Sequence, residues 1–303
     1  MLFFQKMFMK LIIPIVFSLG LSGVILPSWA DEATEYKIEQ MKDNVYRFSA
    51  GHYHSIFVVT DAGILVTDPI NDAAASYLKK ELAKRFTVPI RYLVYSHNHI
   101  DHTMGGHILA NRDIRVVAHE FAAEDLQWTK APTALPDITF QDAKTLQLGD
   151  SEIHLQYHGP NNGRGSVSMR VMPANVLFVV DWIVLGRMPY QNLLGYDIHG
   201  MIHSTREVLA AEPFDLFIGG HADTGTREDV EHYLGYLEAL YAAVREGMLA
   251  GKTLETLQAE IRLPEYAHLR MYDEWLPMNI AGVYQTLVEQ SYFNFRPDLN
   301  VEF

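Results

Sequence analysis

The chain has 303 residues, a formal net charge of −13 and no cysteine. Its length is enough for one large domain with a buried core. Its acidity disfavours nucleic acid and anionic lipid as partners, and the missing cysteine excludes both disulfides and an amino-terminal lipid-modified cysteine. We therefore expect a protein whose stability depends on its hydrophobic core and on any metal that it binds.

Residues 1–30 have the features of a secretory signal peptide. Two lysines precede an apolar run at residues 11–26, and Ser28 and Ala30 supply the small side chains that a signal peptidase reads. We predict cleavage after Ala30, export to the periplasm or the medium, and a single mature domain at residues 31–303 with no lasting membrane anchor. The alternative is an uncleaved anchor, but the run is short for a membrane span and contains a proline.

Strands and helices alternate in the first half of the mature chain. Alternating polar and apolar residues predict a meander of strands at residues 36–69. A helical pattern at residues 73–86 and a short aliphatic and aromatic run at residues 90–95 complete a strand, helix, strand unit with the last strand of the meander, residues 63–67. Beyond this unit we predict a short helix, a strand and a second helix at residues 103–111, 114–118 and 120–130.

The second half of the chain repeats this order more loosely and then becomes helical. The predicted strands are residues 152–158, 166–172, 176–180 and 214–218, and the predicted helices are residues 227–240, 254–261 and 278–290. No linker rich in Gly, Ser or Pro marks a second domain. Two groups of strands flanked by helices predict a layered α+β domain with a helical carboxyl-terminal part.

The strongest chemical signal is the segment His97-Asn98-His99-Ile100-Asp101-His102, which follows the predicted strand at residues 90–95. Three imidazoles and one carboxylate within six residues are the donor types that zinc prefers, and they converge only if the chain curls around a metal. The spacing therefore predicts a metal site at a rigid strand end. The alternative is a polar, solvated turn.

This motif and its continuation resemble the metallo-β-lactamase fold superfamily of hydrolases over nearly the whole mature chain. The matching residues, each placed where a predicted strand ends, are Asp68, His97, His99, Asp101, His102, Asp181 and His221. The resemblance implies a four-layer αβ/βα sandwich with two β-sheets inside and helices outside. It also implies a metal site in a groove at one edge of the sheets.

The same resemblance implies a role for each matching residue. One zinc ion would be held by His97, His99 and a third histidine, the other by Asp101, His102 and His221, with Asp181 bridging the two. Asp101 is also the expected catalytic residue, because it would both ligate the metal and hold the attacking water. Asp68 is expected to steady the histidine segment from behind the ligands, with a plain turn residue as the alternative.

The third histidine of the family is missing from this chain. Asn162 stands at its position, and an amide oxygen is a poor zinc ligand compared with imidazole. We therefore expect one firmly bound zinc and a weaker second one, unless His158 or His54 replaces the missing ligand. Arg164 adds a positive charge nearby, which would either repel a second cation or bind an anionic substrate.

A few other residues have two interpretations. His54 lies between two predicted strands, where it would either contact substrate in the groove or belong to an exposed loop. His107 and His119 are expected to be structural. The aromatic segments at residues 182–190 and 272–277 would form either a substrate wall or part of the core.

Taken with the resemblance, these observations predict an exported, zinc-dependent hydrolase. Metal-activated water would attack an ester, thioester, lactone or amide bond of a small-molecule substrate. Some β-lactamase classes of this superfamily use a cysteine ligand, and the absent cysteine argues against those classes. Weak β-lactamase-like activity is an alternative function. Asn162 and Arg164 favour a rival hypothesis, in which the chain is a binding or regulatory protein with a degraded metal site. Redox chemistry at two irons is a further rival, which Asn162 disfavours.

Overall fold

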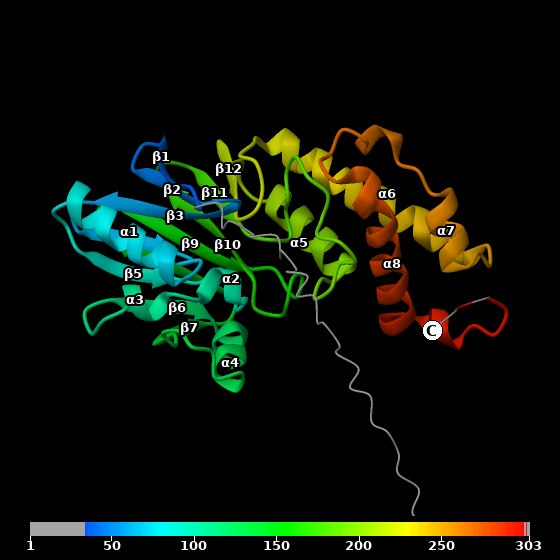
Figure 1. Cartoon of the computed structure of the whole chain (residues 1–303), viewed down its shortest axis with the longest axis horizontal. Helices are drawn as coiled ribbons and strands as arrows, with labels where there is room; N and C mark the ends of the chain where they lie inside the picture. Colours follow the sequence, from blue (N-terminus) through cyan, green and yellow to red (C-terminus); the bar gives the residue numbers. More distant parts are fainter. Residues whose placement is uncertain (1–33, 300, 302–303) are drawn as a thin grey trace, which may run out of the picture. The chain divides into compact units, whose positions relative to one another are not determined.

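The computed structural model describes residues 34–299 and 301. The predicted signal peptide at residues 1–30 lies outside the described residues. Figure 1 shows that the described chain forms two β-sheets, followed by a group of helices that includes its carboxyl-terminal part.

The first sheet has seven strands whose order in space is their order in the chain. They are β1 (Tyr36–Lys42), β2 (Val45–Ala50), β3 (Tyr53–Thr60), β4 (Gly63–Thr67), β5 (Ile90–Val94), β6 (Arg115–His119) and β7 (Ile138–Phe140). The first four form an antiparallel meander, whereas β4 to β7 run parallel to one another. Because Thr67 pairs with Val94 in parallel strands, the segments that follow β4 and β5 leave the sheet at the same edge.

The second sheet has five strands in the order β12, β11, β10, β9, β8. They are β8 (Ala143–Leu148), β9 (Ser151–Tyr157), β10 (Val167–Met172), β11 (Val176–Val179) and β12 (Leu216–Gly219). Neighbouring strands are antiparallel except β11 and β12, which are parallel and pair Val179 with Gly219. The segments after these two strands therefore also leave the sheet side by side.

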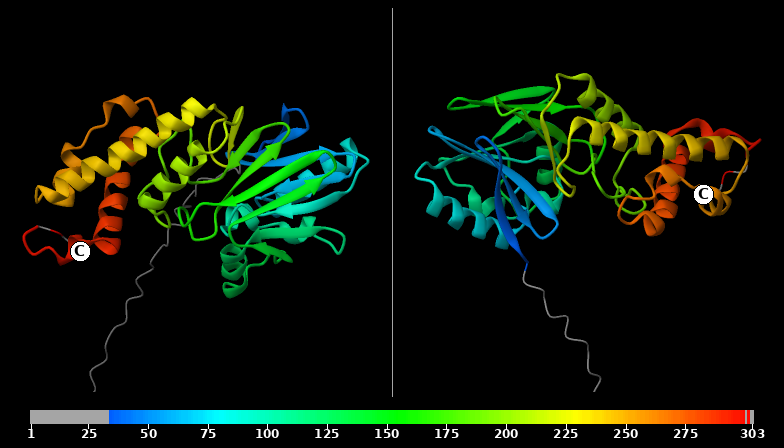
Figure 2. Two further views of the ribbon diagram at one scale, coloured as in Figure 1. Left: turned by 180° about the vertical axis from the view of Figure 1, so that it is seen from behind. Right: turned by 90° about the horizontal axis from the view of Figure 1, so that it is seen from above.

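The two sheets pack face to face, as Figure 2 shows most clearly in the view from above. Alternation of side chains along each strand decides which residues meet between them. On β4, Leu65 belongs to the core between the sheets together with Phe178 of β11, whereas its neighbours Ile64 and Val66 belong to the core on the outer side of the first sheet. Burying each of these side chains stabilises the fold by roughly 1.5 to 3 kcal/mol.

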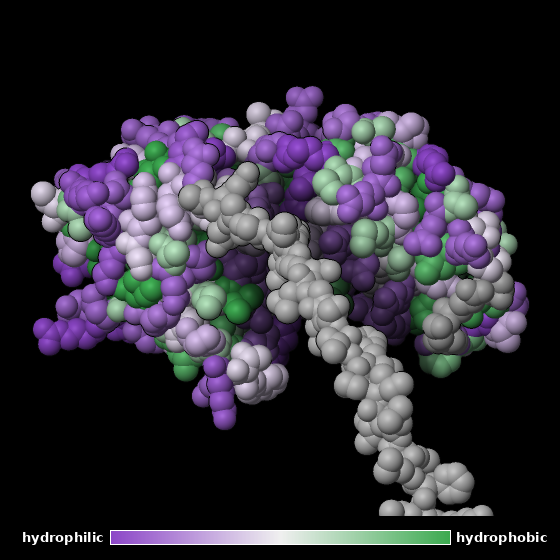
Figure 3. All heavy atoms as spheres, in the orientation of Figure 1, coloured by the Kyte–Doolittle hydropathy of each residue, from purple (hydrophilic) through white to green (hydrophobic). Residues whose placement is uncertain are grey.

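Helices cover both outer faces and complete a four-layer α+β sandwich. On the first sheet lie α1 (Asp72–Arg85), α3 (Gly106–Leu109) and α4 (Glu120–Trp128), and the short α2 (Ile100–Thr103) comes between β5 and α3 in the chain. On the side of the second sheet lie α5 (Ile198–Ala210), α6 (Arg227–Leu249), α7 (Leu254–Glu260) and α8 (Tyr272–Gln290), with short 3-10 helices at η1 (Pro264–Tyr266) and η2 (Tyr292–Phe295). In the space-filling view of Figure 3, hydrophilic side chains predominate on the face shown and hydrophobic ones are scattered.

Most elements predicted from the sequence are confirmed within a few residues, and the differences have physical reasons. The patterns do not predict β7 and β8, which are short or carry several polar residues. They also do not predict α5, where Gly200 and β-branched residues lower the helix propensity. The aromatic segment at residues 272–277, expected to be either a substrate wall or part of the core, is the first part of α8, which contains Pro277. Within the described part of the chain, no helix has both the length and the apolarity that crossing a membrane requires.

Candidate metal centre

Three strand ends bring the predicted metal ligands together. The segment with the three histidines follows β5, Asp181 lies just beyond β11, and His221 follows β12. Asp181 has a left-handed backbone conformation with φ 68°, which turns the chain sharply out of the sheet. Aspartate tolerates this conformation better than most residues, so the local sequence suits the turn.

Two groups of donors lie close enough to hold a metal ion. The first consists of Asp101, His102 and His221, and the second of His97, His102 and Asp181; within each group the ligand atoms lie within 4.8 Å of one another. The Nε2 atoms of His102 and His221 approach to 2.9 Å. Asp181 faces both groups, because Oδ1 lies 3.1 Å from His221 Nε2 and Oδ2 lies 3.1 Å from His97 Nε2.

His99 stands at the open side of this cluster. Its Nδ1 lies 3.6 Å from Asp181 Oδ2, and its ring centroid lies 4.4 Å from that of His97. His97 is only 1% exposed, whereas the His99 side chain is 36% exposed. Ser96 Oγ lies 2.9 Å from His97 Nδ1 and so fixes the ring with Nε2 toward Asp181.

The charges of the cluster are strongly coupled. Burial pushes the pKa of Asp181 upward, but the adjacent imidazoles of His97, His102 and His221 outweigh burial and hold it well below its usual range. Burial likewise opposes the charged form of His102, but hydrogen bonds with Asp101, Asp181 and Asp68 raise its pKa well above 6.5. Three carboxylates around one imidazole make this a place that favours positive charge.

Asp68 connects the first sheet to the histidines. Its side chain is fully buried; Oδ1 accepts a hydrogen bond of 2.8 Å from the Ser96 backbone N–H, and Oδ2 lies 3.3 Å from His102 Nδ1. A carboxylate behind a ligating imidazole holds the ring and places the proton on Nδ1, which leaves the Nε2 lone pair for a metal. The steadying role of Asp68 stays a prediction, which these distances allow.

Asn162 lies inside the cluster, with its amide directed at Asp181. Its side chain is fully buried, and its Nδ2 donates a hydrogen bond to Asp181 Oδ2. Helix α5 holds this loop in place, since a Cβ at Gly200 would collide with the carbonyl oxygen of Pro160. Ser204 of the same helix accepts a hydrogen bond from Asn161. The position expected for the third histidine thus holds an amide that already contacts Asp181.

The residues fit a divalent metal. Among the described residues, the buried polar atoms at the cluster that have no hydrogen-bond partner include His97 Nε2, His102 Nδ1, Asp68 Oδ2, Asp181 Oδ1 and Asn162 Oδ1. Buried polar atoms are rarely left unpaired in native proteins. Imidazole nitrogen and carboxylate oxygen are suitable ligands for zinc and similar ions, so the donor set and the unpaired atoms point to the same kind of group.

Arg164 lies in a different environment from the one expected. Its guanidinium donates hydrogen bonds to Asp125 and Glu124 of α4 and lies over the rings of Phe121 and Trp128. The hydrogen bonds that it donates to the two carboxylates raise its pKa further above the usual value. Because its charge is already compensated, Arg164 is not a free cation near Asn162, and the geometry does not support a role in repelling a metal.

Neither candidate for the missing ligand points at the metal cluster. His158 Nδ1 lies 2.9 Å from Glu207 Oε2, and its Nε2 lies 2.8 Å from Ser168 Oγ. His54 Nδ1 lies 2.9 Å from Ser49 Oγ, and burial lowers the pKa of His54 to about 4. Its backbone N–H donates to Gly220, so His54 lies beside the loop of His221 without replacing a ligand.

The two histidines expected to be structural have the contacts of such residues. His119 is buried, its Nδ1 accepts a hydrogen bond from the Phe121 N–H at the start of α4, and its Nε2 lies 2.6 Å from the Gln141 carbonyl oxygen. His107 is half exposed and lies 3.8 Å from Asp72.

Aromatic residues and one arginine surround the cluster. The ring of Tyr53 lies 5.0 Å from that of His221. Arg187 lies with its guanidinium 5.2 Å from the ring centroid of Trp275, and within the electrostatic reach of Asp181 and Tyr196. Sequence patterns carry no specific signal for Tyr53 or Tyr196, because only the fold brings these tyrosines to the metal ligands.

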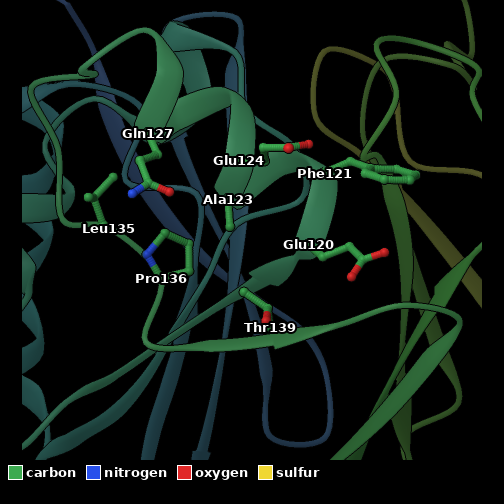
Figure 4. Close-up of a pocket in the computed structure, with 8 residues that line it drawn as sticks. All are labelled: Glu120, Phe121, Ala123, Glu124, Gln127, Leu135, Pro136 and Thr139. Atoms are coloured by element: carbon green, nitrogen blue, oxygen red, sulfur yellow. The ribbon is translucent and has the colours of Figure 1, made fainter.

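A large cavity elsewhere has no part in this cluster. It has a volume of about 550 Å³ and lies between α4 and the strand that contains Thr139 (Figure 4). Glu120 and Glu124 face it from α4, and Leu135 and Pro136 close the other side (Figure 4). None of the residues that line it belongs to the two donor groups.

Comparison with known proteins agrees with this architecture. The chain is 23% identical to the 2,4-dinitroanisole O-demethylase subunit alpha of a Nocardioides species over 257 residues, which cover 80% of this chain and 76% of that protein. Its structure is similar to that of a mutant of the sec-alkyl sulfatase PisA1, with a TM-score of 0.70, 18% identity and coverage of 86% of this chain and 52% of that one.

A metallo-beta-lactamase from Pontibacter korlensis is also similar in structure, with a TM-score of 0.60, 17% identity and coverage of 67% of this chain and 99% of that one. The sequence model of one family, described as the metallo-beta-lactamase superfamily, matches residues 49–221, which is more than half of the chain. The matched range includes every residue of the two donor groups. The chain therefore belongs to the metallo-β-lactamase superfamily.

Proposed function

We propose that this protein is an exported, zinc-dependent hydrolase of small molecules that cleaves an ester, thioester, lactone or amide bond. The convergence of Asp101, His102, His221 and Asp181 within one cluster carries the proposal. Zinc held by such ligands supplies Lewis acidity, which lowers the pKa of water to near neutrality and polarises the bond under attack. No nucleophile from the protein is then needed.

Asp101 is the residue that we assign to the reacting water. Its side chain is 35% exposed, whereas Asp181 is 6% exposed and Asp68 is fully buried. Asp101 is thus the carboxylate of the cluster that water and substrate can reach. From this position it can accept a hydrogen bond from the water and receive its proton as the new bond forms.

Arg187 is the residue that we assign to substrate binding. It is half-buried, and within the described residues it has no carboxylate within ion-pair distance. Arg270, its close neighbour, is by contrast paired with Asp223. A half-buried, uncompensated guanidinium beside the metal ligands can bind a polar or anionic group of the substrate.

The rival is a binding or regulatory protein that kept the fold and lost the reaction. Asn162 favours this rival, because its amide nitrogen, not its oxygen, faces Asp181. The donor group of Asp101, His102 and His221 does not include a contact with Asn162, however, and its three side chains lie together. We therefore expect about one tightly held zinc per chain and retained hydrolysis.

Elemental analysis of the purified mature protein, combined with a substrate screen, tests the proposal. The screen contains chromogenic esters, thioesters, lactones and cephalosporins, with a secondary alkyl sulfate and an aryl methyl ether added because of the similar proteins. Asp101→Ala should reduce turnover by several orders of magnitude, and Asp113→Ala, an exposed control, should not. Protein without bound metal and without any turnover would favour the rival. Amino-terminal sequencing of the exported protein should start at Asp31.

A further inference from the structure

A second group of reactive side chains lies on the outer face of the second sheet. Ser168 of β10 has its Oγ 2.8 Å from His158 Nε2, and Glu207 of α5 has Oε2 2.9 Å from His158 Nδ1. Ser168 and His158 are 5% and 8% exposed. These contacts form a hydroxyl, imidazole, carboxylate chain in the order that nucleophilic serine sites use.

This chain of contacts borders a cavity of its own. The cavity has a volume of about 380 Å³ and lies between the second sheet and α5, and both Ser168 and His158 line it. Met172, Leu177 and Phe214 give it an apolar wall, and Arg170 gives it positive charge. None of its lining residues belongs to the metal cluster.

The protonation states of these groups suit a nucleophilic site. Burial lowers the pKa of His158, although the hydrogen bond to Glu207 opposes this effect, so the imidazole is neutral near pH 7. Glu207 can only accept from Nδ1–H, which leaves the Nε2 lone pair directed at the Ser168 hydroxyl. The hydroxyl therefore has an acceptor for its proton at hydrogen-bond distance.

We propose that Ser168, His158 and Glu207 form a second, metal-independent site that transfers the acyl group of small esters with an apolar acyl chain. Ser168 Oγ forms a bond to the carbonyl carbon while its proton passes to His158 Nε2. The bond to the alcohol oxygen then breaks, and the alcohol leaves with that proton. Water attacks the acyl-serine, gives one proton to His158 and releases the acid, after which the proton returns to Ser168 Oγ.

Each part of the cavity has a role in this reaction. Glu207 orients the imidazole and stabilises its charged form. The Arg170 guanidinium is held by Asn175 and by the carbonyl oxygens of Glu212 and Pro213, and its charge favours the negative oxygen that develops during attack. The apolar wall accepts the acyl chain, and the cavity volume limits its length.

Labelling with a fluorophosphonate probe tests the proposal on the full mature chain after the metal has been removed with a chelator. Attack by Ser168 Oγ forms an O–P bond and releases fluoride together with the proton. Peptide mass spectrometry of the labelled wild type should locate the adduct on Ser168. Because this measurement uses the wild-type protein, it does not depend on whether any variant folds. An adduct elsewhere, or none at all, would overturn the proposal.

Two variants and a control sharpen the test. Ser168→Ala should abolish labelling, and Glu207→Gln should slow it about tenfold or more. Thr145→Ala is the matched control, because Thr145 Oγ1 lies 3.2 Å from His154 Nδ1 on the same sheet but does not line the cavity. Circular dichroism checks that each variant is folded. Equal labelling rates in folded Glu207→Gln and in the wild type would contradict the assigned role of Glu207. Because the protein is metal-free, failure here leaves the proposed zinc chemistry untouched.

Discussion

Replacing Asp68 with asparagine should weaken zinc binding without unfolding the protein. The amide oxygen can still accept the hydrogen bond from the Ser96 N–H. The amide NH₂ group, however, would replace the carboxylate oxygen that lies 3.3 Å from His102 Nδ1. A donor at that place favours the tautomer of His102 with its proton on Nε2, the atom that should bind the metal.

The expected size of the effect follows from this position. Removing a partner of a ligating histidine typically costs 10- to 100-fold in metal affinity, which corresponds to about 1.4 to 2.7 kcal/mol. The fold should tolerate the change, because Asp68 has a φ of 33° and asparagine adopts this left-handed region about as readily as aspartate. The buried volume is also nearly unchanged.

Competition with a chromogenic chelator measures the zinc affinity of the wild type and of the variant. Asp72→Asn is the control, since Asp72 is exposed at the start of α1 and lies away from the cluster. The variant should bind zinc 10 to 100 times more weakly and keep its melting temperature in the metal-free form within a few degrees. If folded Asp68→Asn binds zinc as tightly as the wild type, the steadying role of Asp68 is wrong.

Three further predictions concern other parts of the chain. Asn162→His should raise the bound zinc from about one toward two per chain by elemental analysis, whereas Arg164→Ala should leave it unchanged because α4 carboxylates already neutralise Arg164. Burial lowers the pKa of His119 below 6.5, so the unfolded state binds the proton more readily, and the free energy of unfolding decreases as the pH is lowered from about 6.5. In urea titrations at pH 7 and pH 5, His119→Asn should lose less of this free energy between the two pH values than the wild type does. Leu65→Ala should cost about 2 to 5 kcal/mol in the same titrations, and a loss below 1 kcal/mol would contradict its place in the core.

Local patterns in the sequence determine the elements and the donor set of the site. Side chains along a strand or helix repeat with fixed periods, so α1, β4 and β5 are readable from their residues alone. The metal site is also predictable from local sequence, because the four donors His97, His99, Asp101 and His102 lie within one short segment. Helix α5 is not predicted, because Gly200 and β-branched residues lower its helix propensity, although its buried residues Ile198, Met201, Ile202, Thr205 and Val208 have helical spacing.

The tertiary structure decided which charges are compensated and which groups meet. Arg164 is a free cation in the sequence, but the fold places it against Asp125 and Glu124, about 40 positions earlier in the chain. His158 is a candidate ligand in the sequence, but β10 and α5 bring Ser168 and Glu207 to its two nitrogens. Such contacts depend on how strands pair and on which helix covers which face. Local periodicity carries no information about partners that lie so far apart in the chain.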